Sequence, residues 1–373
     1  MLERTATAQT LLHLSLIPGN HHNSINKIIA SSESKRFAIA DIYSFNATDF
    51  AQYCGIATAR ANKLMEGLSD TALLDKELAY LNTYTDISWC TIADTQYPSL
   101  LKTIAVPPPV IYWQGAALQE DEKRLAVVGA RKANEYGKQF IDCIIPTIVS
   151  QQWVIVSGGA IGADTFAHQA TLAVNGKTVA ILGSGLLNPY PTENISLFKK
   201  IVASGGTLLS TFPLATQAAP AHFPERNRII SGISKGCVVV QAAKRSGASI
   251  TAHCALEQGR EVFAVPGPIY DPLSAGCHAL IQEGAKLVSN AAEILQEFGE
   301  LVPVAPRQER QMTLPIIPLA PDQAALLNSC PASINDLLES TGLSLQELNA
   351  QLFELQLAGL IEQDFTGRWQ QVK

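Results

Sequence analysis

The feature that most constrains the fold is a series of short apolar runs that alternate with helix-like stretches between about residues 124 and 289. The runs are 124–130, 153–159, 177–185, 206–212, 236–242, 260–267 and 285–289. They are rich in Val, Ile and Leu and lack the polar alternation of a strand with one face in water. Such runs are typical of parallel strands buried on both faces, with the intervening helices as covering layers. We therefore expect an extended, Rossmann-like α/β domain with a doubly wound, mostly parallel sheet.

The remaining segments flank this central domain. The chain has 373 residues, more than one average domain of about 100–200 residues. The N-terminal segment shows helical spacing of apolar residues with tight glycine turns, which predicts a small helical domain, either a generic one or a module of the SAM or helix-hairpin-helix kind. The C-terminal segment shows three helical stretches and then a hairpin pattern, which predicts a winged helix. The expected parts are the helical module 1–85, the Rossmann-like domain 86–298, a proline-containing linker 299–320 and the winged helix 321–373.

Composition excludes several classes of protein. Hydrophobic residues make up 47% of the chain, which is too much for a mainly disordered protein. No apolar stretch approaches the roughly 20 residues that a membrane-spanning helix needs, and the first residues lack a signal-peptide layout, so we expect a cytoplasmic protein without a membrane partner. The seven cysteines are odd in number and form no CxxC pair. This pattern argues against a disulfide framework and against a zinc site.

The charge distribution limits how the protein could bind an anion. The net charge is −6, so no global positive field surrounds the molecule. The excess acid lies at the C-terminal end, because residues 320–373 carry 7 Asp and Glu against 2 Lys and Arg, whereas residues 86–319 carry 18 of each. An anion site in the central domain must therefore be a local cluster.

Small and hydroxyl residues follow nearly every predicted strand. In an open parallel sheet the carboxyl ends of the strands form one ligand-binding edge, where small residues let backbone N–H groups and helix N-termini approach an anion. The residues are Ala130-Arg131, Ser157-Gly158-Gly159, Gly183-Ser184-Gly185, Ser210-Thr211, Lys244-Arg245-Ser246-Gly247 and Pro266-Gly267-Pro268. Glycine also serves tight turns in any α/β fold, but six such ends on one edge favour an anion or phosphate site.

Few charged side chains accompany this edge. Arg131 follows the first core strand, and Arg226-Asn227-Arg228 opens a predicted helix. Arginine suits bidentate phosphate contacts and stacking against bases. The alternative for Arg131 is a surface ion pair, and the alternative for the second group is a structural cluster at a helix N-terminus.

Two nucleotide-binding motifs are absent from the sequence. It contains no GxGxxG and no GxxxxGK[ST] pattern, and Ser184 has no evident base partner. Asp164 and His168 lie four residues apart on one predicted helix, but no set of Cys, His, Asp and Glu completes a metal site. We interpret them as a carboxylate near a helix N-terminus and a packed histidine. We expect no enzymatic activity, no metal and no cofactor.

Six segments, in order, carry a resemblance to a known family. They are VVGARKANEYG (127–137), SGGAIGADTFAH (157–168), GKTVAILGSGLLNPYPTEN (176–194), FPERNRIISGIS (223–234), KRSGASITAHCALEQGREVFAVPG (244–267) and GCHALIQEGAKLV (276–288). Together they resemble the DprA/Smf family, DNA-processing protein A, over roughly residues 86–298. The resemblance implies an extended Rossmann domain, with SAM-like and winged-helix modules in many members. It also implies a non-enzymatic protein that binds single-stranded DNA, dimerises and loads the RecA recombinase during natural transformation.

The resemblance also implies which residues contact DNA. Arg131 matches the arginine that contacts DNA, and the glycine turns match those that line the phosphate. Together with Ser184 and Lys244, which come from the strand ends and not from the resemblance, the full set of expected contacts is Arg131, Ser157, Gly158, Gly183, Ser184, Gly185, Arg226, Asn227, Arg228, Lys244, Ser246, Gly247 and Thr251. Three positions depart from the family pattern: Ile161 stands where a basic residue is usual, and Thr211 and Gln241 stand where glutamate is usual.

The expected function is therefore that of a single-stranded-DNA-binding recombination mediator, which protects incoming DNA, helps to load RecA, and forms a homodimer through its Rossmann-like domain. One alternative is a Rossmann-like nucleotide phosphoribohydrolase, which base release from a nucleoside monophosphate would reveal. Pro266-Gly267-Pro268 is not followed by the glutamate of that group's PGGxGTxxE motif. A second alternative is an interaction scaffold whose DNA pocket is weakened by Ile161, which a gel shift with an unstructured oligonucleotide would test.

The winged helix is not expected to be the main DNA-binding part of the chain. Its predicted helices at 333–340 and 344–358 contain no Lys or Arg, so phosphate would find no positioning contacts there. An apolar stripe of Leu345, Leu348, Leu352 and Leu355 favours either a protein-facing surface or the module's own core.

Overall fold

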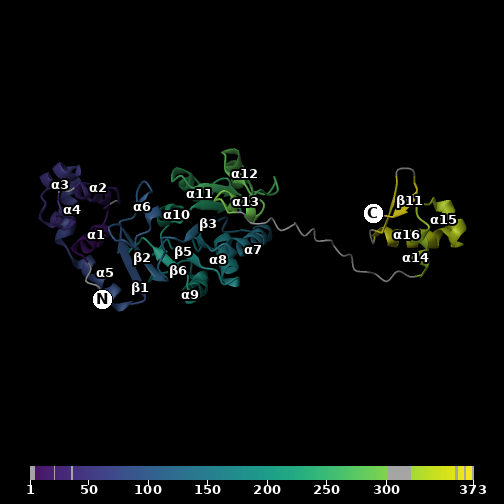
Figure 1. Ribbon diagram of the computed structural model, residues 1–373, viewed down its shortest axis with the longest axis horizontal. Coiled ribbons are helices and arrows are strands. Elements are labelled where there is room, and N and C mark those ends of the chain that lie inside the picture. The colour runs from purple at the N-terminus through teal and green to yellow at the C-terminus, as the bar shows by residue number, and fades with distance from the viewer. Residues whose placement is uncertain are drawn as a thin grey trace. The chain divides into compact units, whose positions relative to one another are not determined.

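The structure is a computed structural model that describes residues 5–20, 22–34, 37–300, 321–357, 360–364 and 367–371. The chain forms two compact units, residues 1–303 and 304–373 (Figure 1). The predicted linker lies outside the described residues from position 301 onward.

One nine-stranded sheet organises the described part of the larger unit, with strand order β1-β2-β6-β5-β4-β3-β7-β8-β9. The strands are β1 Ile87–Thr91, β2 Val110–Gly115, β3 Lys123–Val128, β4 Trp153–Ser157, β5 Thr178–Ile181, β6 Thr207–Ser210, β7 Gly236–Val239, β8 Glu261–Ala264 and β9 Lys286–Leu287. The seven strands from β6 to β9 in this order are parallel, whereas β1 and β2 add an antiparallel edge. The predicted Rossmann-like, mostly parallel sheet is confirmed.

Helices cover both faces of this sheet (Figure 1). They are α6 Ser99–Lys102, α7 Glu135–Ser150, α8 Ala163–Ala173, α9 Ile195–Ala203, α10 His222–Gly232, α11 Gly247–Glu257, α12 Ala275–Gln282 and α13 Ala291–Gln296. Alternate residues of β3 separate the two layers: Ala126 and Val128 pack with α10, α11 and α12, whereas Leu125 and Val127 pack with α7, α8 and α13. The strands are apolar throughout because both of their faces are buried.

The strand order reverses beside β3. From β3 the chain passes through α7 to β4 on one side, whereas β7 pairs with the other side of β3. The loops that follow β3 and β7 therefore diverge at the carboxyl edge. A crevice at such a switch point is where open α/β sheets bind ligands.

The N-terminal helices pack on the antiparallel edge of the sheet. They are α1 Ala6–Leu16, α2 His22–Glu33, the 3₁₀ helix η1 Ile39–Ser44, α3 Ala47–Cys54, α4 Thr58–Ser69 and α5 Ala72–Thr83. Helix α1 has two apolar faces: Leu11 and Leu14 belong to the core among the helices, whereas Ala8 and Leu12 belong to a core shared with Trp89 of β1. The helical segment therefore shares packing with the sheet.

Within the described residues, the second unit contains three helices and a two-stranded hairpin, the order of elements expected of a winged helix. They are α14 Pro321–Asn328, α15 Ile334–Thr341, α16 Leu345–Leu357, β10 Ile361–Gln363 and β11 Trp369–Gln371. Leu348, Leu352 and Leu355 are buried in the module's own core, but Leu345 is 53% exposed. Most of the predicted leucine stripe is thus internal packing.

No helix within the described ranges combines the length and the apolar character needed to cross a membrane.

Candidate functional site

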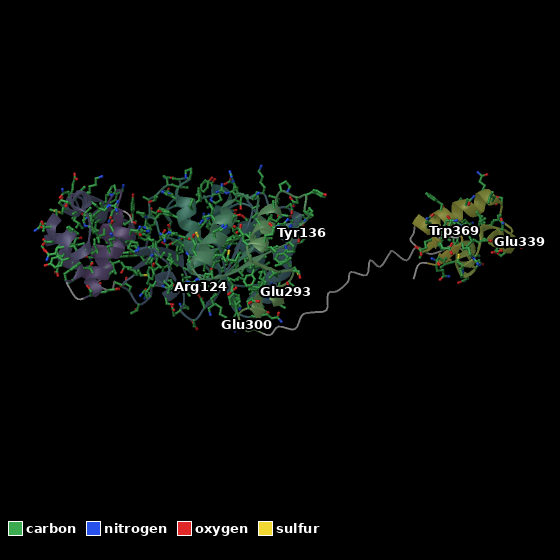
Figure 2. The ribbon with its side chains drawn as sticks, turned by 90° about the horizontal axis from the view of Figure 1, so that it is seen from above. Arg124, Tyr136, Glu293, Glu300, Glu339 and Trp369 are labelled. Carbon is green, nitrogen blue, oxygen red and sulfur yellow. The ribbon has the colours of Figure 1, made fainter. Side chains whose placement is uncertain are left out.

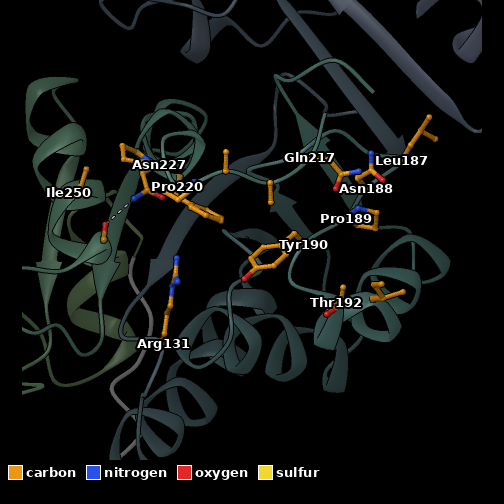
Figure 3. A pocket seen from close by; sticks show the side chains of 16 residues that line it. Arg131, Leu187, Asn188, Pro189, Tyr190, Thr192, Gln217, Pro220, Asn227 and Ile250 are labelled. Carbon is orange, nitrogen blue, oxygen red and sulfur yellow. Dashed lines mark hydrogen bonds between the residues drawn. The ribbon is translucent and has the colours of Figure 1, made fainter. Parts of the chain in front are cut away.

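Two adjoining pockets open at the carboxyl edge of the sheet, one of about 930 Å³ and one of about 350 Å³. Both are lined by Arg131, Phe223, Asn227 and Gly247, so they form one continuous cleft (Figure 3). The smaller pocket lies between the loops that follow β3 and β7, and the larger one extends along the segments around residues 187–192 and 217–220. The cleft occupies the switch point of the sheet.

Arg131 is an exposed cation that lines both pockets of this cleft. Its guanidinium carbon lies 5.2 Å from the centroid of the Phe223 ring, and Figure 3 shows its side chain reaching from the end of β3 into the space between the walls. In the described parts of the chain no carboxylate forms an ion pair with it. The guanidinium is therefore oriented by an aromatic ring and is open to an anionic ligand.

The N-terminus of α11 also faces the cleft. Ser246 caps the helix by accepting a hydrogen bond from the Ser249 N–H at 3.2 Å, and Gly247 and Ala248 line the smaller pocket. The first turn of α11 contains no acidic residue, so the positive end of the helix dipole is not neutralised locally. Asn227 secures this end, because its Nδ2 donates to the Gly247 carbonyl at 3.0 Å, the dashed line in Figure 3.

An aromatic wall completes the larger pocket. The rings of Tyr190 and Phe223 lie 5.9 Å apart between centroids, and Tyr190 is 44% exposed. Pro189 and Pro220 extend this apolar surface (Figure 3), and Pro224 also lines the pocket. An unpaired nucleotide has a negatively charged phosphate and a flat base. The Arg131 cation suits the phosphate, and the aromatic side chains beside it suit the base.

Arg226 also lines the smaller pocket but, in contrast to Arg131, is only 5% exposed. Its guanidinium donates to the carbonyls of Gly158 and Ile181, the latter at 2.7 Å, and its Nε donates to the Asn227 Oδ1 at 3.1 Å. Burial lowers the pKa of this guanidinium, while the nearby Asp164 carboxylate acts in the opposite direction. Arg226 therefore braces the ends of β4 and β5 from inside.

Asp164 accepts hydrogen bonds from the backbone amides that follow β4. Its Oδ2 accepts hydrogen bonds from the N–H groups of Gly158 at 3.1 Å and Ala160 at 3.2 Å. Burial raises the pKa of this carboxyl, and the positive charge of Arg226 opposes the rise. The Ser157 hydroxyl donates to the Val127 carbonyl at 2.7 Å. The turn at Ser157-Gly158 thus already holds an internal anion.

The glycine turn after β5 is likewise closed. Gly183, Ser184 and Gly185 are buried, and the Gly185 N–H donates to the Thr216 carbonyl at 2.9 Å. A side chain at Gly185 would collide with the main chain at Pro213-Leu214. The Ser184 hydroxyl is buried and has no hydrogen-bond partner among the described residues. This turn shapes the wall of the cleft from behind.

The remaining predicted residues lie at different distances from the cleft. Arg228 points away from it, since its guanidinium contacts the Val106 carbonyl and the His22 Nδ1. Lys244 is exposed and follows Ala243, which lines the smaller pocket. Thr251 also lines this pocket but is buried, and its hydroxyl donates to the Gly247 carbonyl at 3.2 Å.

One departure from the family pattern has a structural explanation. Gln241 is buried, accepts the Asn134 N–H at 3.0 Å and donates to the Asn134 Oδ1 at 2.9 Å. An amide makes both contacts, whereas a carboxylate only accepts. Ile161 is 47% exposed, so its side chain supplies apolar surface where a cation is usual in the family.

Sequence reasoning missed several lining residues. Lys132, Asn188, Tyr190, Gln217 and Phe223 line the cleft, but none was singled out as a contact. The signal for Phe223 was its position three residues before Arg226, which places both on one face of α10. The others lie on loops whose paths the sequence does not specify.

Metal binding finds no support in the described residues, where no group of three or more His, Cys, Asp and Glu side chains is placed to hold an ion.

Fold and site together define a Rossmann-like α/β protein with a cationic, aromatic-lined cleft at its switch point, followed by a small helix-and-hairpin unit. The chain belongs to the DNA recombination-mediator protein A family, which matches residues 88–299. The DprA winged helix domain matches residues 312–364.

Individual relatives agree with this assignment. Protein Smf of Escherichia coli (strain K12) is 40% identical over 279 residues, which cover 72% of this chain and 74% of that protein. DNA processing protein DprA of Bacillus subtilis (strain 168) is 43% identical over 210 residues, which cover 56% of this chain and 70% of that protein.

Two solved structures are similar as well. The X-ray structure of DNA processing protein A from Streptococcus pneumoniae has a TM-score of 0.68 at 35% identity, covering 79% of this chain and 99% of that one. DNA processing protein A from Helicobacter pylori, whose structure is described in terms of a unique single-stranded DNA binding mode, has a TM-score of 0.51 at 25% identity, covering 57% of this chain and 95% of that one.

Proposed function

We propose that this protein binds single-stranded DNA in the cleft and acts as a recombination mediator that protects incoming DNA and helps to load RecA during natural transformation. The observation that carries the proposal is the exposed Arg131 guanidinium, placed between the Phe223 ring and the N-terminus of α11. The single-stranded DNA binding named for the Helicobacter pylori relative supports the same ligand. The role requires no chemical step, no metal and no cofactor, and it places the protein in the cytoplasm.

Single strands suit the cleft better than duplexes do. Non-specific duplex binding depends on many cationic contacts, and the central domain carries no excess of Lys and Arg. Single-strand binding adds stacking of bases on aromatic rings, which Tyr190 and Phe223 offer.

We assign the predicted site residues to two roles. Arg131, Asn227, Lys244, Ser246 and Gly247 are proposed to contact the strand. A second set is buried or points away from the cleft and is proposed to hold its shape, although two of its members, Arg226 and Thr251, also line the smaller pocket: Ser157, Gly158, Gly183, Ser184, Gly185, Arg226, Arg228 and Thr251.

Two further parts of the proposal concern partners. Homodimerisation through the Rossmann-like domain is supported by strand β9, an edge strand within the described residues that leaves Leu287 47% exposed. RecA loading is tested by measuring RecA filament assembly on single-stranded DNA coated with single-strand-binding protein, with and without this chain.

The winged-helix unit is proposed to face a protein and not DNA. The exposed residues of α16 include Leu345, Asn349 and Phe353, with Glu347 and Glu354 as its charged residues. Phosphate finds no cation on this helix, and repulsion from the carboxylates opposes its approach.

The test is fluorescence anisotropy of a labelled oligo-dT with the wild type and Arg131→Ala. Loss of a phosphate contact or stacking arginine is expected to weaken binding about tenfold to a hundredfold, or roughly 1–3 kcal/mol. Arg131→Lys keeps the charge without the planar fork and should fall between the two. Lys200→Ala removes an exposed cation of α9 outside the cleft lining and serves as the matched control. Unchanged affinity in a folded Arg131→Ala protein would overturn the assignment of the site.

A further inference from the structure

We propose that the strand path continues beyond the cleft onto a second aromatic platform, Tyr270, at the tip of the loop that follows β8. This inference rests on the proposed function, because it extends the path of the same single-stranded DNA. Tyr270 is 95% exposed and its neighbour Ile269 is 75% exposed, the highest values among the exposed large hydrophobic side chains of the described residues.

The loop that carries Tyr270 is firmly held on both sides of its tip. On the first side, the hydroxyl of Tyr136, labelled in Figure 2, donates to the Pro266 carbonyl, and the His278 Nε2 lies 3.0 Å from the Gly267 oxygen. On the second side, the Ala242 N–H donates to the Leu273 carbonyl at 2.7 Å. The exposure of the tip therefore belongs to an ordered loop, and little conformational entropy is lost when a base stacks there.

The same loop is continuous with the cleft. Leu273 lines the smaller pocket together with Ala243 and Ser246, so the loop after β8 forms one of its walls. The hydrogen bond between Ala242 and Leu273 joins the loops that follow the neighbouring strands β7 and β8. A strand that leaves Arg131 along the carboxyl edge next meets this loop.

The charge of the neighbouring residues favours a nucleic acid as the occupant. Lys132, Lys244 and Arg245 are exposed on the loops after β3 and β7. The loop's own carboxylate, Asp271, accepts the Leu273 N–H at 2.9 Å and is thus engaged within its turn. Cations that track a phosphodiester chain beside a flat exposed ring are the two components of single-strand recognition.

Oligonucleotide length separates the platform from the cleft. Binding is measured by anisotropy for an oligo-dT of about 6 nucleotides, which the cleft alone can hold, and for one of about 15, within the usual range of single-strand sites. Tyr270→Ala is expected to weaken the longer oligonucleotide about fivefold or more and to leave the shorter one unchanged. Tyr270→Phe is expected to retain wild-type affinity. Tyr84→Ala, which removes a 42%-exposed tyrosine of the helical segment, is the matched control.

A fluorescent variant gives an independent readout. Trp89, Trp113 and Trp153 are buried, so a tryptophan introduced by Tyr270→Trp would be the solvent-exposed one in the described part of the larger unit. Its emission is expected to be quenched by the longer oligonucleotide and not by the shorter one.

The outcomes separate the two claims. If the wild type binds neither oligonucleotide, the proposed function fails and the platform fails with it. If the wild type binds both and Tyr270→Ala changes neither affinity, or changes both by the same factor, the platform alone is wrong. A length-dependent loss in Tyr270→Ala, with length-dependent quenching in Tyr270→Trp, supports it.

Discussion

The carboxyl edge of the sheet has two halves that look alike in sequence and differ in structure. After β4 and β5, the turns at Ser157-Gly158 and Gly183–Gly185 are buried, and the amides of Gly158 and Gly185 are bonded internally. After β3 and β7, Arg131 and the N-terminus of α11 are open to solvent. Both halves are rich in small residues. What separates them is whether another part of the chain already supplies the partner.

The comparison shows why a glycine-rich strand end is an ambiguous sign of an anion site. Backbone amides in a tight turn need an acceptor, and an internal carboxylate satisfies that need as well as an external phosphate does. Asp164 fills this role after β4. No such carboxylate lies in the first turn of α11.

Replacing the two arginines in turn tests this division most strongly. Arg226→Ala removes a buried cation and leaves Asp164 and two carbonyls without it, so the free energy of unfolding is expected to fall by roughly 3–5 kcal/mol. Arg131→Ala, on the exposed half, is expected to leave it unchanged within about 0.5 kcal/mol. Urea unfolding followed by circular dichroism measures both. Equal losses of stability in the two variants would contradict the division.

Adding one methyl group to each half is a gentler test. In Gly158→Ala the new Cβ would lie 2.6 Å from the Arg226 guanidinium carbon and 2.7 Å from the Asp164 Oδ2. Such overpacking is expected to cost roughly 1–3 kcal/mol, seen as a lower Tm. In Gly247→Ala the Cβ would meet the Asn227 Nδ2 at an ordinary 3.8 Å, so the Tm is expected to hold. If the Gly158→Ala protein is as stable as the Gly247→Ala protein, the contacts of Gly158 with Arg226 and Asp164 leave room for a methyl group, and the prediction is wrong.

Acid offers a test that changes charge inside the closed half. Burial, helped by the charge of Arg226, lowers the pKa of His168 to about 3, well below its ordinary 6.5. Between pH 6.5 and 3 the unfolded chain binds a proton at this histidine that the folded chain does not, so stability falls as the pH falls, by about 1.4 kcal/mol per pH unit. Above pH 6.5 this contribution is constant.

The histidine's share is isolated by comparing the wild type with His168→Phe in denaturant titrations at pH 7, 6 and 5. The wild type is expected to show the steeper decline below pH 6.5. Parallel profiles for the two proteins would mean that His168 is protonated without cost and is not sealed from solvent.

Removal of the winged-helix unit is expected to have the smallest effect. A chain ending at Gly299 keeps the cleft and loses a unit with more carboxylates than cations, so oligo-dT affinity should stay within about twofold, with the same dependence on salt. Anisotropy at several salt concentrations measures both quantities. Loss of most of the affinity in a well-folded truncation would assign the unit to the DNA site.

The sequence was sufficient for the architecture. Apolar runs such as 124–130 and 236–242 have no polar alternation, and only a strand covered on both faces satisfies that pattern, so the doubly wound sheet follows from local information. The switch point follows less directly, because strand order depends on which distant strands pair. Arg131 could be placed at the ligand edge because it directly follows a core strand.

Only the tertiary structure decided which residues at the carboxyl edge are exposed to solvent and which already have internal hydrogen-bond partners. Arg226 and Arg228 are two residues apart on α10, yet one braces β4 and β5 from within and the other contacts Val106 and His22. The rings of Tyr190 and Phe223 come together from segments that are distant in the chain. Local sequence determines secondary structure through periodicity and turn chemistry. Exposure and hydrogen-bond occupancy are decided by partners brought close by folding, such as Asp164 for the amide of Gly158.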